Sequence, residues 1–220
     1  MHYFNLNLSR RIKHGAWLAL VAIVINGCAS DPGRTTGQPR ATSQNPIDPG
    51  KITITSVTEG LRLASLSREP LASTFRAKAA KLALAAGQLE DANRILALIK
   101  TSNIAPNTTV DYVLTKAQLA LIDGNANQAL ALLNQNDLTQ FGLSTQDQIA
   151  LGITKANAYE QTGRMLAAAR TRTLITPILA DAAAADNHEQ LFKGLMTLPA
   201  ALLKRYATDA ATNDLRGWLS

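Results

Sequence analysis

Apolar residues recur at helical spacing along most of the chain between residues 70 and 180, and glycines interrupt this pattern at regular distances. Before Gly87 and before Gly124 the apolar positions lie three or four residues apart, and the same spacing returns after each of these glycines. Such spacing places side chains on one face of an α-helix. The pattern therefore predicts pairs of amphipathic helices that are joined at a glycine.

The glycines Gly87, Gly124 and Gly163 mark a period of 37–39 residues. An alanine stands seven residues before each glycine and another stands five residues after it: Ala80, Ala117, Ala156, Ala92, Ala129 and Ala168. Glycine adopts the positive φ that ends one helix and turns the chain into the next. The small alanines allow two helix backbones to approach closely, so we expect them where the helices of a pair cross.

Helix starts are marked by residues whose side chains accept hydrogen bonds from the free N–H groups of a first turn. The candidate capping pairs are Ser56 with Glu59, Thr108 with Asp111, and Ser144 with Asp147. Pro70 stands where a first helical turn tolerates proline. These signals predict helices near residues 56–66, 70–86, 89–100, 108–122, 126–134, 144–162 and 164–179.

The residues after about 180 break this period, and there we predict helices near 187–196, 199–208 and 211–219. Four apolar residues could cover the end of the preceding helices: Met196, Leu198, Leu202 and Leu203. The sequence reaches its last residues with Trp218 and Leu219, which need a surface to pack on. Two alternatives stay open: these residues fold back onto the last helix pair, or the chain is the front part of a longer protein.

Helix pairs repeated every 34–40 residues define an α-solenoid, so the predicted fold class is all-α, with this domain spanning residues 51–220. The alanine and glycine spacing resembles the tetratricopeptide repeat. Lys116 and Lys155 stand where that repeat has leucine, and its early tryptophan and its final proline are not matched. We therefore expect degenerate repeats, and the peptide-clamp residues of that repeat are not carried over to this chain.

The first residues follow the order of an export signal. Arg10, Arg11 and Lys13 precede an apolar run over residues 16–25, and Gly27-Cys28 follows it. A membrane span needs about 20 apolar residues, so we expect cleavage rather than retention of segment 1–27. The signal resembles a bacterial lipoprotein signal, which implies that Cys28 is acylated. The next residue is Ala29 rather than aspartate, which resembles the sorting signal of lipoproteins destined for the outer membrane rather than of those retained at the inner membrane. The alternative is that Cys28 is an ordinary residue beside a secretory cleavage site.

Residues 28–50 are rich in proline, glycine and small polar residues and show no apolar period. Such a segment cannot bury enough apolar surface to offset the entropy of ordering, so we predict a flexible tether. Removal of the basic signal lowers the formal net charge from +6 to +3. A charge of this size in an exported chain is poor evidence for nucleic-acid binding. Weak attraction to anionic lipid or to cell-wall polymer stays open.

Catalytic motifs are not found: there is no phosphate-binding glycine loop, no G-x-S-x-G elbow and no S-x-x-K. His188 is the one histidine after the signal, and a zinc site needs three or four ligands, so we predict no metal, no cofactor and no catalytic residue. The acidic pair Glu90 and Asp91 is expected to serve the first turn of a helix rather than acid–base catalysis. A solvated face is favoured over a basic binding patch for the pairs Arg170 with Arg172 and Lys204 with Arg205. Tyr112 and Tyr159 are expected at helix–helix contacts, with partner binding as the alternative.

Three stretches together with the signal and the tether carry a resemblance to a known family: residues 74–80, residues 87–92 and the segment 214–219. The chain resembles the N-terminal part of the LpoA-type lipoproteins, the penicillin-binding protein activators, over about residues 10–220. The resemblance implies an outer-membrane lipoprotein that stimulates a class A penicillin-binding protein, which is a peptidoglycan synthase. The family's second domain, which resembles a periplasmic binding protein and is expected to contact the synthase, has no counterpart in these residues. The chain is therefore expected to be either a fragment or a shortened relative.

The leading hypothesis is a non-catalytic regulator of wall synthesis that is anchored by lipid and acts through protein contacts. The alternative is a helical-repeat lipoprotein that serves as a scaffold for assembly of the envelope, of pili or of outer-membrane proteins. An enzyme acting on peptidoglycan is the least favoured hypothesis, because the sequence supplies no catalytic set.

Overall fold

The computed structural model describes residues 53–219, and this part of the chain consists of α-helices and short 3₁₀ helices without a strand. The all-α prediction is thereby confirmed. The predicted signal 1–27, the predicted tether 28–50 and the predicted acylation site Cys28 lie outside the described residues. Predictions for those segments stay predictions.

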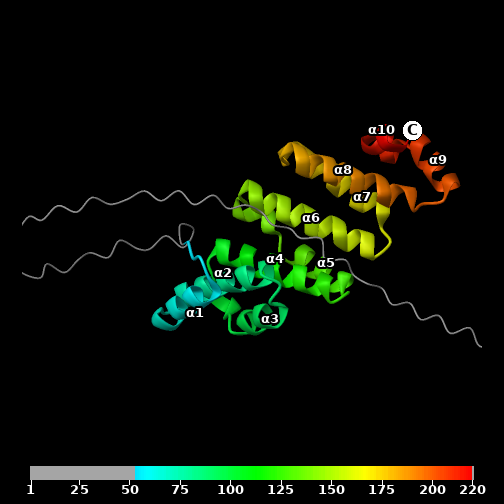
Figure 1. Cartoon of the computed structure of the whole chain (residues 1–220). Helices are drawn as coiled ribbons and strands as arrows, with labels where there is room; N and C mark the ends of the chain where they lie inside the picture. Colours follow the sequence, from blue (N-terminus) through cyan, green and yellow to red (C-terminus); the bar gives the residue numbers. More distant parts are fainter. Residues whose placement is uncertain (1–52, 220) are drawn as a thin grey trace, which may run out of the picture. The chain divides into compact units, whose positions relative to one another are not determined.

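The α-helices of the described part follow the predicted order closely (Figure 1). Their bounds are α1 (Val57–Leu66), α2 (Leu71–Ala85), α3 (Leu89–Ala97), α4 (Pro106–Ile122), α5 (Ala126–Gln135), α6 (Thr145–Gln161), α7 (Met165–Ile175), α8 (Asp181–Met196), α9 (Ala200–Thr208) and α10 (Arg216–Leu219). Short 3₁₀ helices lie between some of them, namely η2 (Thr101–Asn103), η3 (Leu138–Phe141), η4 (Thr176–Ile178) and η5 (Ala210–Leu215).

The three glycines of the period all have positive φ, with values of 74° at Gly87, 76° at Gly124 and 74° at Gly163. Each glycine N–H donates to the carbonyl three residues earlier, and the next N–H donates to the carbonyl five residues before it, over distances of 2.7–3.1 Å. This pair of bonds defines a Schellman motif, which satisfies carbonyls that a helix end leaves free. The same turn therefore joins α2 to α3, α4 to α5, and α6 to α7.

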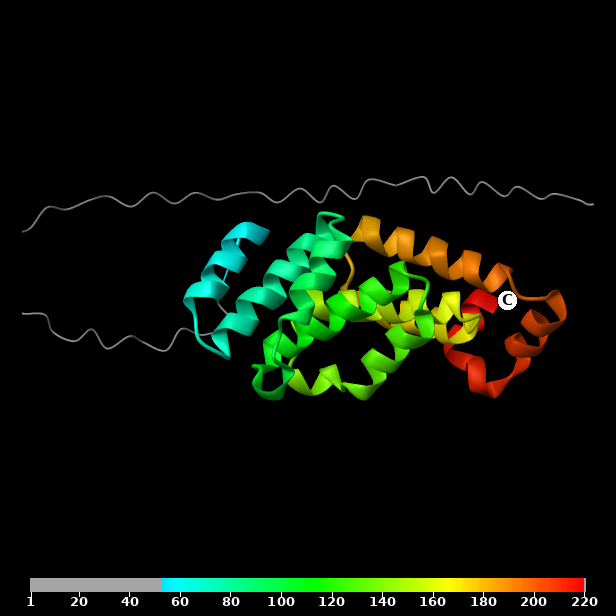
Figure 2. The same ribbon diagram turned by 90° about the horizontal axis from the view of Figure 1, so that it is seen from below.

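The first helices of the three pairs contact one another in sequence, α2 with α4 and α4 with α6, and α1 packs against α2. Figure 2 shows the helices of the described part following one another in chain order from α1 to the C-terminal helices. The period alanines are buried at the crossings, with exposed fractions of 0–2% for all six: Ala80, Ala92, Ala117, Ala129, Ala156 and Ala168. Backbones come close there because no larger side chain separates them.

Two of the three predicted capping pairs are confirmed. The Ser56 and Ser144 hydroxyls accept hydrogen bonds from the N–H groups of Glu59 (3.1 Å) and Asp147 (3.2 Å). The third prediction was wrong, because α4 begins at Pro106 after Ala105, and Thr108 is buried in its first turns. The Thr108 hydroxyl instead bonds the Thr74 hydroxyl of α2 at 2.7 Å, which ties the first two pairs together.

The predicted bounds fail where the apolar period fails. Helix α8 begins at Asp181 rather than near 187, because alanines at 182–185 form helix readily without an apolar stripe. Helix α7 ends at Ile175, because Pro177 follows and lacks an N–H donor. Residues 210–215 form a 3₁₀ segment instead of an α-helix, since the Thr212 hydroxyl donates to the carbonyls of Tyr206 and Asp209.

The chain end folds back onto the last helices, which is one of the two predicted alternatives for Trp218 and Leu219. Both side chains pack against a buried cluster of Ala169, Leu191, Leu195 and Leu215. The Trp218 ring also lies 4.9 Å from the His188 ring, at 55° to it. The described C-terminal helices thus form a separate small core that continues the stack beyond α7.

Candidate functional site

The structure offers surface hollows rather than a catalytic cluster within residues 53–219. In that range no group of three or more histidine, cysteine, aspartate or glutamate side chains is placed to hold a metal ion. Helices long and apolar enough to cross a membrane are likewise not found between residues 53 and 219. Three of the hollows along the described helix pairs are candidate functional sites, one charged, one polar and one mainly apolar.

The charged hollow, of about 460 Å³, lies where the first helices of the three pairs meet. The Lys81 ammonium of α2 lies 2.7 Å from a carboxylate oxygen of Asp111 on α4 and 3.4 Å from one of Asp147 on α6. Lys78, one turn earlier, lies 3.8 Å from the second oxygen of Asp111. Lys81 thereby links α2, α4 and α6, which are the first helices of the three pairs.

The electrostatics of this hollow favour the charged form of the lysine. Burial alone would lower the pKa of Lys81, but the carboxylates of Asp111 and Asp147 outweigh this effect and raise its pKa above the ordinary value of 10.5. Two ammonium groups here face two carboxylates, so the charges balance. The hollow consequently holds the helices in register and has no unbalanced charge with which to attract an ionic substrate.

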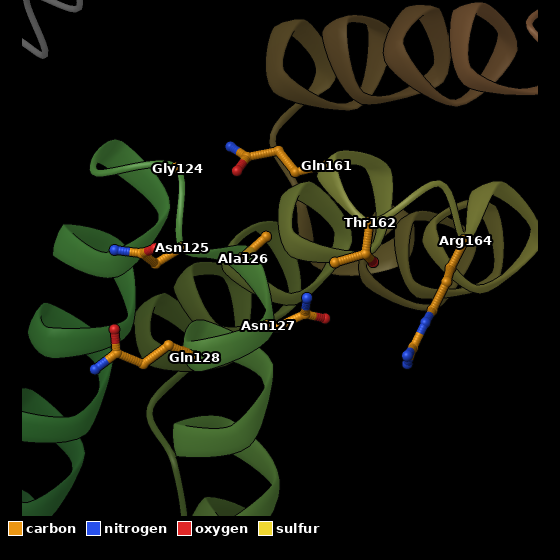
Figure 3. Close-up of a pocket in the computed structure, with 8 residues that line it drawn as sticks. All are labelled: Gly124, Asn125, Ala126, Asn127, Gln128, Gln161, Thr162 and Arg164. Carbon is orange, nitrogen blue, oxygen red and sulfur yellow. The ribbon is translucent and has the colours of Figure 1, made fainter.

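The polar hollow, of about 480 Å³, lies beside the second and third glycine turns and is drawn in Figure 3. Its lining comes from the turn and first helical residues of α5 and from the turn before α7: Gly124, Asn125, Ala126, Asn127, Gln128, Gln161, Thr162 and Arg164. In the view of Figure 3, Arg164 points away from Asn125 and Gln128. Amides and one exposed guanidinium can donate and accept hydrogen bonds, but they form no acid–base pair.

The apolar hollow, of about 410 Å³, lies between α6, α7 and the connection that precedes α6. Leu143, Leu151, Leu174 and Ile175 supply its apolar wall, and the Leu174 side chain is 78% exposed. A Cβ added at Gly152 would overlap Ile175, so this glycine is what lets α7 approach α6 so closely. Lys155 is the one charged residue among those that line the hollow.

The two lysines that depart from the tetratricopeptide pattern lie in different surroundings. The Lys116 ammonium lies 5.3 Å from the centroid of the Tyr112 ring and 3.1 Å from its hydroxyl. Lys155 occupies the corresponding place on α6, eight residues before the turn glycine, and lines the apolar hollow. Tyr112 and Tyr159 both pack at helix contacts, as predicted.

The remaining predicted candidates take structural positions. Asp91 in the first turn of α3 pairs with Arg94 at 2.5 Å, and Arg170 pairs with Asp214 at 3.0 Å. Lys204 and Arg205 are exposed on α9. The prediction of a solvated face was wrong for Arg172, whose side chain is buried.

The Arg172 guanidinium joins three elements in a buried polar network. It donates to a carboxylate oxygen of Glu160 at 2.7 Å and to the side-chain oxygens of Asn157 and Asn187 at 2.9 and 3.1 Å. Asn187 of α8 in turn donates to the Arg172 carbonyl at 2.9 Å. No local sequence pattern indicates this network, because arginine and asparagine at these positions look like ordinary surface residues.

The sequence also contains no local signal for the charged hollow. Asp111 lies 30 residues after Lys81 in the sequence, and Asp147 lies 66 residues after it. Only the packing of α2, α4 and α6 brings the three side chains together. Asp111 and Asp147 were predicted as first-turn acids, and of the two only Asp147 also serves a helix start.

Comparisons with known proteins agree on the described part of the chain. The model of the family described as "LppC putative lipoprotein" matches residues 53–220. No curated protein sequence matches the chain at a significant level. Among solved structures, the LpoA N-terminal domain from Haemophilus influenzae has 20% sequence identity and a TM-score of 0.55, with 78% of this chain and 76% of that chain covered.

Two further solved structures show the same likeness. The E. coli LpoA amino-terminal domain has 17% identity and a TM-score of 0.60, with 78% of this chain and 74% of that chain covered. Full-length LpoA from Haemophilus influenzae has 20% identity and a TM-score of 0.56, and the match covers 78% of this chain but 31% of that chain. At these identities the likeness establishes the fold, and the chain spans about a third of the full-length relative.

Proposed function

The chain belongs to the LppC family of lipoproteins, and from this premise we propose that it regulates peptidoglycan synthesis without catalysing a reaction itself. In this proposal it is anchored by lipid in the outer membrane, faces the periplasm, and stimulates a class A penicillin-binding protein through protein–protein contacts. The observation that carries the proposal is the stack of helix pairs over residues 53–219, which has the fold of LpoA N-terminal domains.

The chemistry of the described surface supports binding better than catalysis. A catalytic site brings an acid, a base or a nucleophile within hydrogen-bond reach of one another in a cleft. The three hollows instead contain a charge-balanced ion-pair cluster, a set of amides and an apolar wall. Stacked helical repeats present extended surfaces that bind other proteins, and such binding needs no reactive group.

Anchoring in this proposal depends on Cys28 and on the tether 28–50. Acylated chains stay on a membrane because each buried CH₂ contributes about 0.8 kcal/mol, so two or more acyl chains hold far better than one. Metabolic labelling with a palmitate analogue tests this step. We expect label on the wild-type chain and none on a Cys28→Ala chain, and an unlabelled wild-type chain would contradict the anchor.

Stimulation is tested with the full chain in detergent and a purified class A penicillin-binding protein from the same organism. The assay follows glycan-chain formation and peptide cross-linking from lipid-linked precursor. We expect both rates, or one of them, to rise with chain concentration and to saturate. Chain that has been heat-unfolded is the control. Unchanged rates at saturating chain would overturn the proposed stimulation.

A muropeptide assay with the chain alone tests the non-catalytic part of the proposal. We expect purified peptidoglycan to be returned unchanged after incubation with the chain. New fragments, or altered cross-links, would identify an enzyme and would overturn this part.

A further inference from the structure

Equivalent positions in the three helix pairs differ in one respect that changes the surface. Twelve residues before the turn glycine the three pairs have Phe75, Tyr112 and Leu151, so the third pair lacks the aromatic ring of the first two. Four residues later, on the same helix face, stand Ala79, Lys116 and Lys155. The third pair therefore keeps the lysine of the second pair but not its tyrosine.

The aromatic ring of the first two pairs fills the space beside its helix. Phe75 is buried in a cluster with Ile54, Ala79 and other apolar residues of the first pair. Tyr112 packs against both the first and the second apolar cluster. Lys116 lies over the Tyr112 ring and donates to the tyrosine hydroxyl, so ring and ammonium stabilise each other.

The third pair leaves the corresponding region open. Leu151 is smaller than tyrosine, and beside it lies the apolar hollow of about 410 Å³. Leu174 on the rim is 78% exposed, which leaves a large apolar side chain in water. Within residues 53–219, Lys155 makes no hydrogen bond or ion pair of the kind that Lys116 makes.

We propose that this hollow is a docking site for a tyrosine side chain presented by an acidic segment of a partner protein. The ring would lie against Leu151, Leu174 and Ile175. The Lys155 ammonium would take the position over the ring that Lys116 takes over Tyr112. This inference rests on the proposed function only in assuming that the chain acts by binding another protein.

The charge of the hollow identifies the kind of segment. Lys155 is the one charged residue that lines it, and no carboxylate lines it to neutralise the ammonium. A cation in a partly dry site attracts both the face of an aromatic ring and a nearby carboxylate. Thr139, Gln148 and Thr171 on the rim can hydrogen-bond a phenol hydroxyl. A tyrosine with acidic neighbours therefore matches the site better than an aliphatic or basic segment.

Fluorescence anisotropy with the full chain in detergent tests the site. The probe is a synthetic peptide, acetyl-Glu-Asp-Tyr-Leu-Glu, with fluorescein at its C-terminus. Matched peptides carry alanine or leucine in place of tyrosine, with the same label. We expect saturable binding of the tyrosine peptide, and binding of the alanine peptide that is at least roughly tenfold weaker.

Three variants place the binding in this hollow. Leu151→Tyr supplies the missing ring from within the chain, so the fold is retained and peptide binding is lost. Lys155→Gln weakens binding by roughly threefold to tenfold, as expected for a cation over a ring. Its matched control is Lys116→Gln in the second pair, which leaves peptide affinity unchanged, because that lysine already contacts Tyr112.

A second matched pair of variants tests the rim of the hollow. Leu174 and Leu98 both stand eleven residues after a turn glycine and both are exposed, but only Leu174 lines the hollow. Leu174→Ser weakens peptide binding several-fold, and Leu98→Ser does not. Thermal unfolding of each variant, followed by circular dichroism, shows whether a loss of binding comes from a loss of fold.

The outcomes separate this inference from the proposed function. Equal affinity for the tyrosine and alanine peptides, or undiminished binding by folded Leu151→Tyr, overturns the docking site. Preference for the leucine peptide also overturns the tyrosine assignment. The same variants are then assayed with the penicillin-binding protein. Peptide binding without stimulation of the synthase supports the site and counts against the proposed function, whereas stimulation of the synthase without any preference for the tyrosine peptide leaves the proposed function standing and overturns the site.

Discussion

The helix pairs from α2 to α7 and the C-terminal helices from α8 to α10 are held together by different interactions. The pairs repeat one turn and one buried alanine crossing, and their contacts are mainly apolar. The C-terminal helices join the stack through the buried Arg172 network and through a small apolar cluster around Leu195 and Leu215. Repetition therefore stabilises the first region by many similar contacts, whereas the second depends on a few individual side chains.

This difference predicts that the stability of the C-terminal helices depends most on one polar residue, Arg172. Arg172→Met removes a buried side chain that is the partner of Glu160, which is 26% exposed, and one partner of the buried Asn187. Breaking a buried charge pair from one side costs roughly 3 kcal/mol or more. We expect urea unfolding to show a free energy of unfolding lower by about 3 kcal/mol, with α8 losing hydrogen-exchange protection first.

The matched control is Arg170→Met, two residues earlier on α7. Arg170 pairs with Asp214 near the surface, where both side chains are about half exposed. Exposed pairs contribute about 0–1 kcal/mol. If Arg170→Met lowers the free energy of unfolding as much as Arg172→Met does, then burial does not explain the effect of Arg172→Met.

In the repeating region the largest effect is expected from overfilling a helix crossing. Ala129 of α5 is completely buried, while Ala131, two residues later, is exposed. We expect Ala129→Leu to lower the free energy of unfolding by about 1–3 kcal/mol, because the added atoms push the backbones apart. Ala131→Leu should change it by less than about 0.5 kcal/mol. Equal effects in denaturant titrations would contradict close packing at the period alanines.

A smaller effect is expected at the turns themselves. Gly124 has φ of 76°, and a Cβ added there meets nothing within 4 Å, so the cost of Gly124→Ala is conformational alone. We expect a loss of about 1–2 kcal/mol in free energy of unfolding. Gly217→Ala adds the same methyl group in α10, also with no atom within 4 Å but without positive φ, and should be neutral or slightly stabilising. Tolerance of alanine at Gly124 would show that the turn does not require a left-handed residue.

The smallest effect concerns pH and the charged hollow. The pKa of Lys81 is raised in the folded chain, so its stabilising effect is complete below the ordinary value of 10.5 and is lost as pH rises through the folded-state pKa. Lys81 is 44% exposed, so the effect should stay below about 1 kcal/mol. We expect wild type to be more stable than Lys81→Met at pH values below 10.5, and the gap to narrow as the pH rises through the raised pKa of Lys81.

The control for this experiment removes a lysine that pairs only on the surface. Lys193 contacts Glu189 on the same helix, and both side chains are well exposed. Lys193→Met should show no gap from wild type that closes with alkaline pH. A gap of the same size and pH dependence would mean that loss of any lysine explains the result.

The sequence predicts the repeating region well because its signals are local. A turn glycine, an alanine five residues after it and a serine at a helix start each act within one or two helical turns. That is why the turns at Gly87, Gly124 and Gly163 and the caps at Ser56 and Ser144 are confirmed. Thr108 looked like such a cap, but burial against Thr74 determines its role, and that contact crosses between pairs.

The surfaces could not be predicted in the same way. The charged hollow needs the rotational phase of α2, α4 and α6 relative to one another, and no short segment of sequence specifies that phase. The buried position of Arg172 depends on α8 lying across α7. The apolar hollow beside Leu151 depends on how α7 and the connection before α6 pack against α6, which no short segment of sequence specifies.

The single turn geometry shared by the three pairs has a mechanical consequence. Each pair contacts mainly its neighbours in sequence, so a force along the stack passes chiefly from one interface to the next, although the Lys81–Asp147 ion pair also joins the first pair to the third. Small rotations at successive interfaces then add up to a large displacement of one end relative to the other.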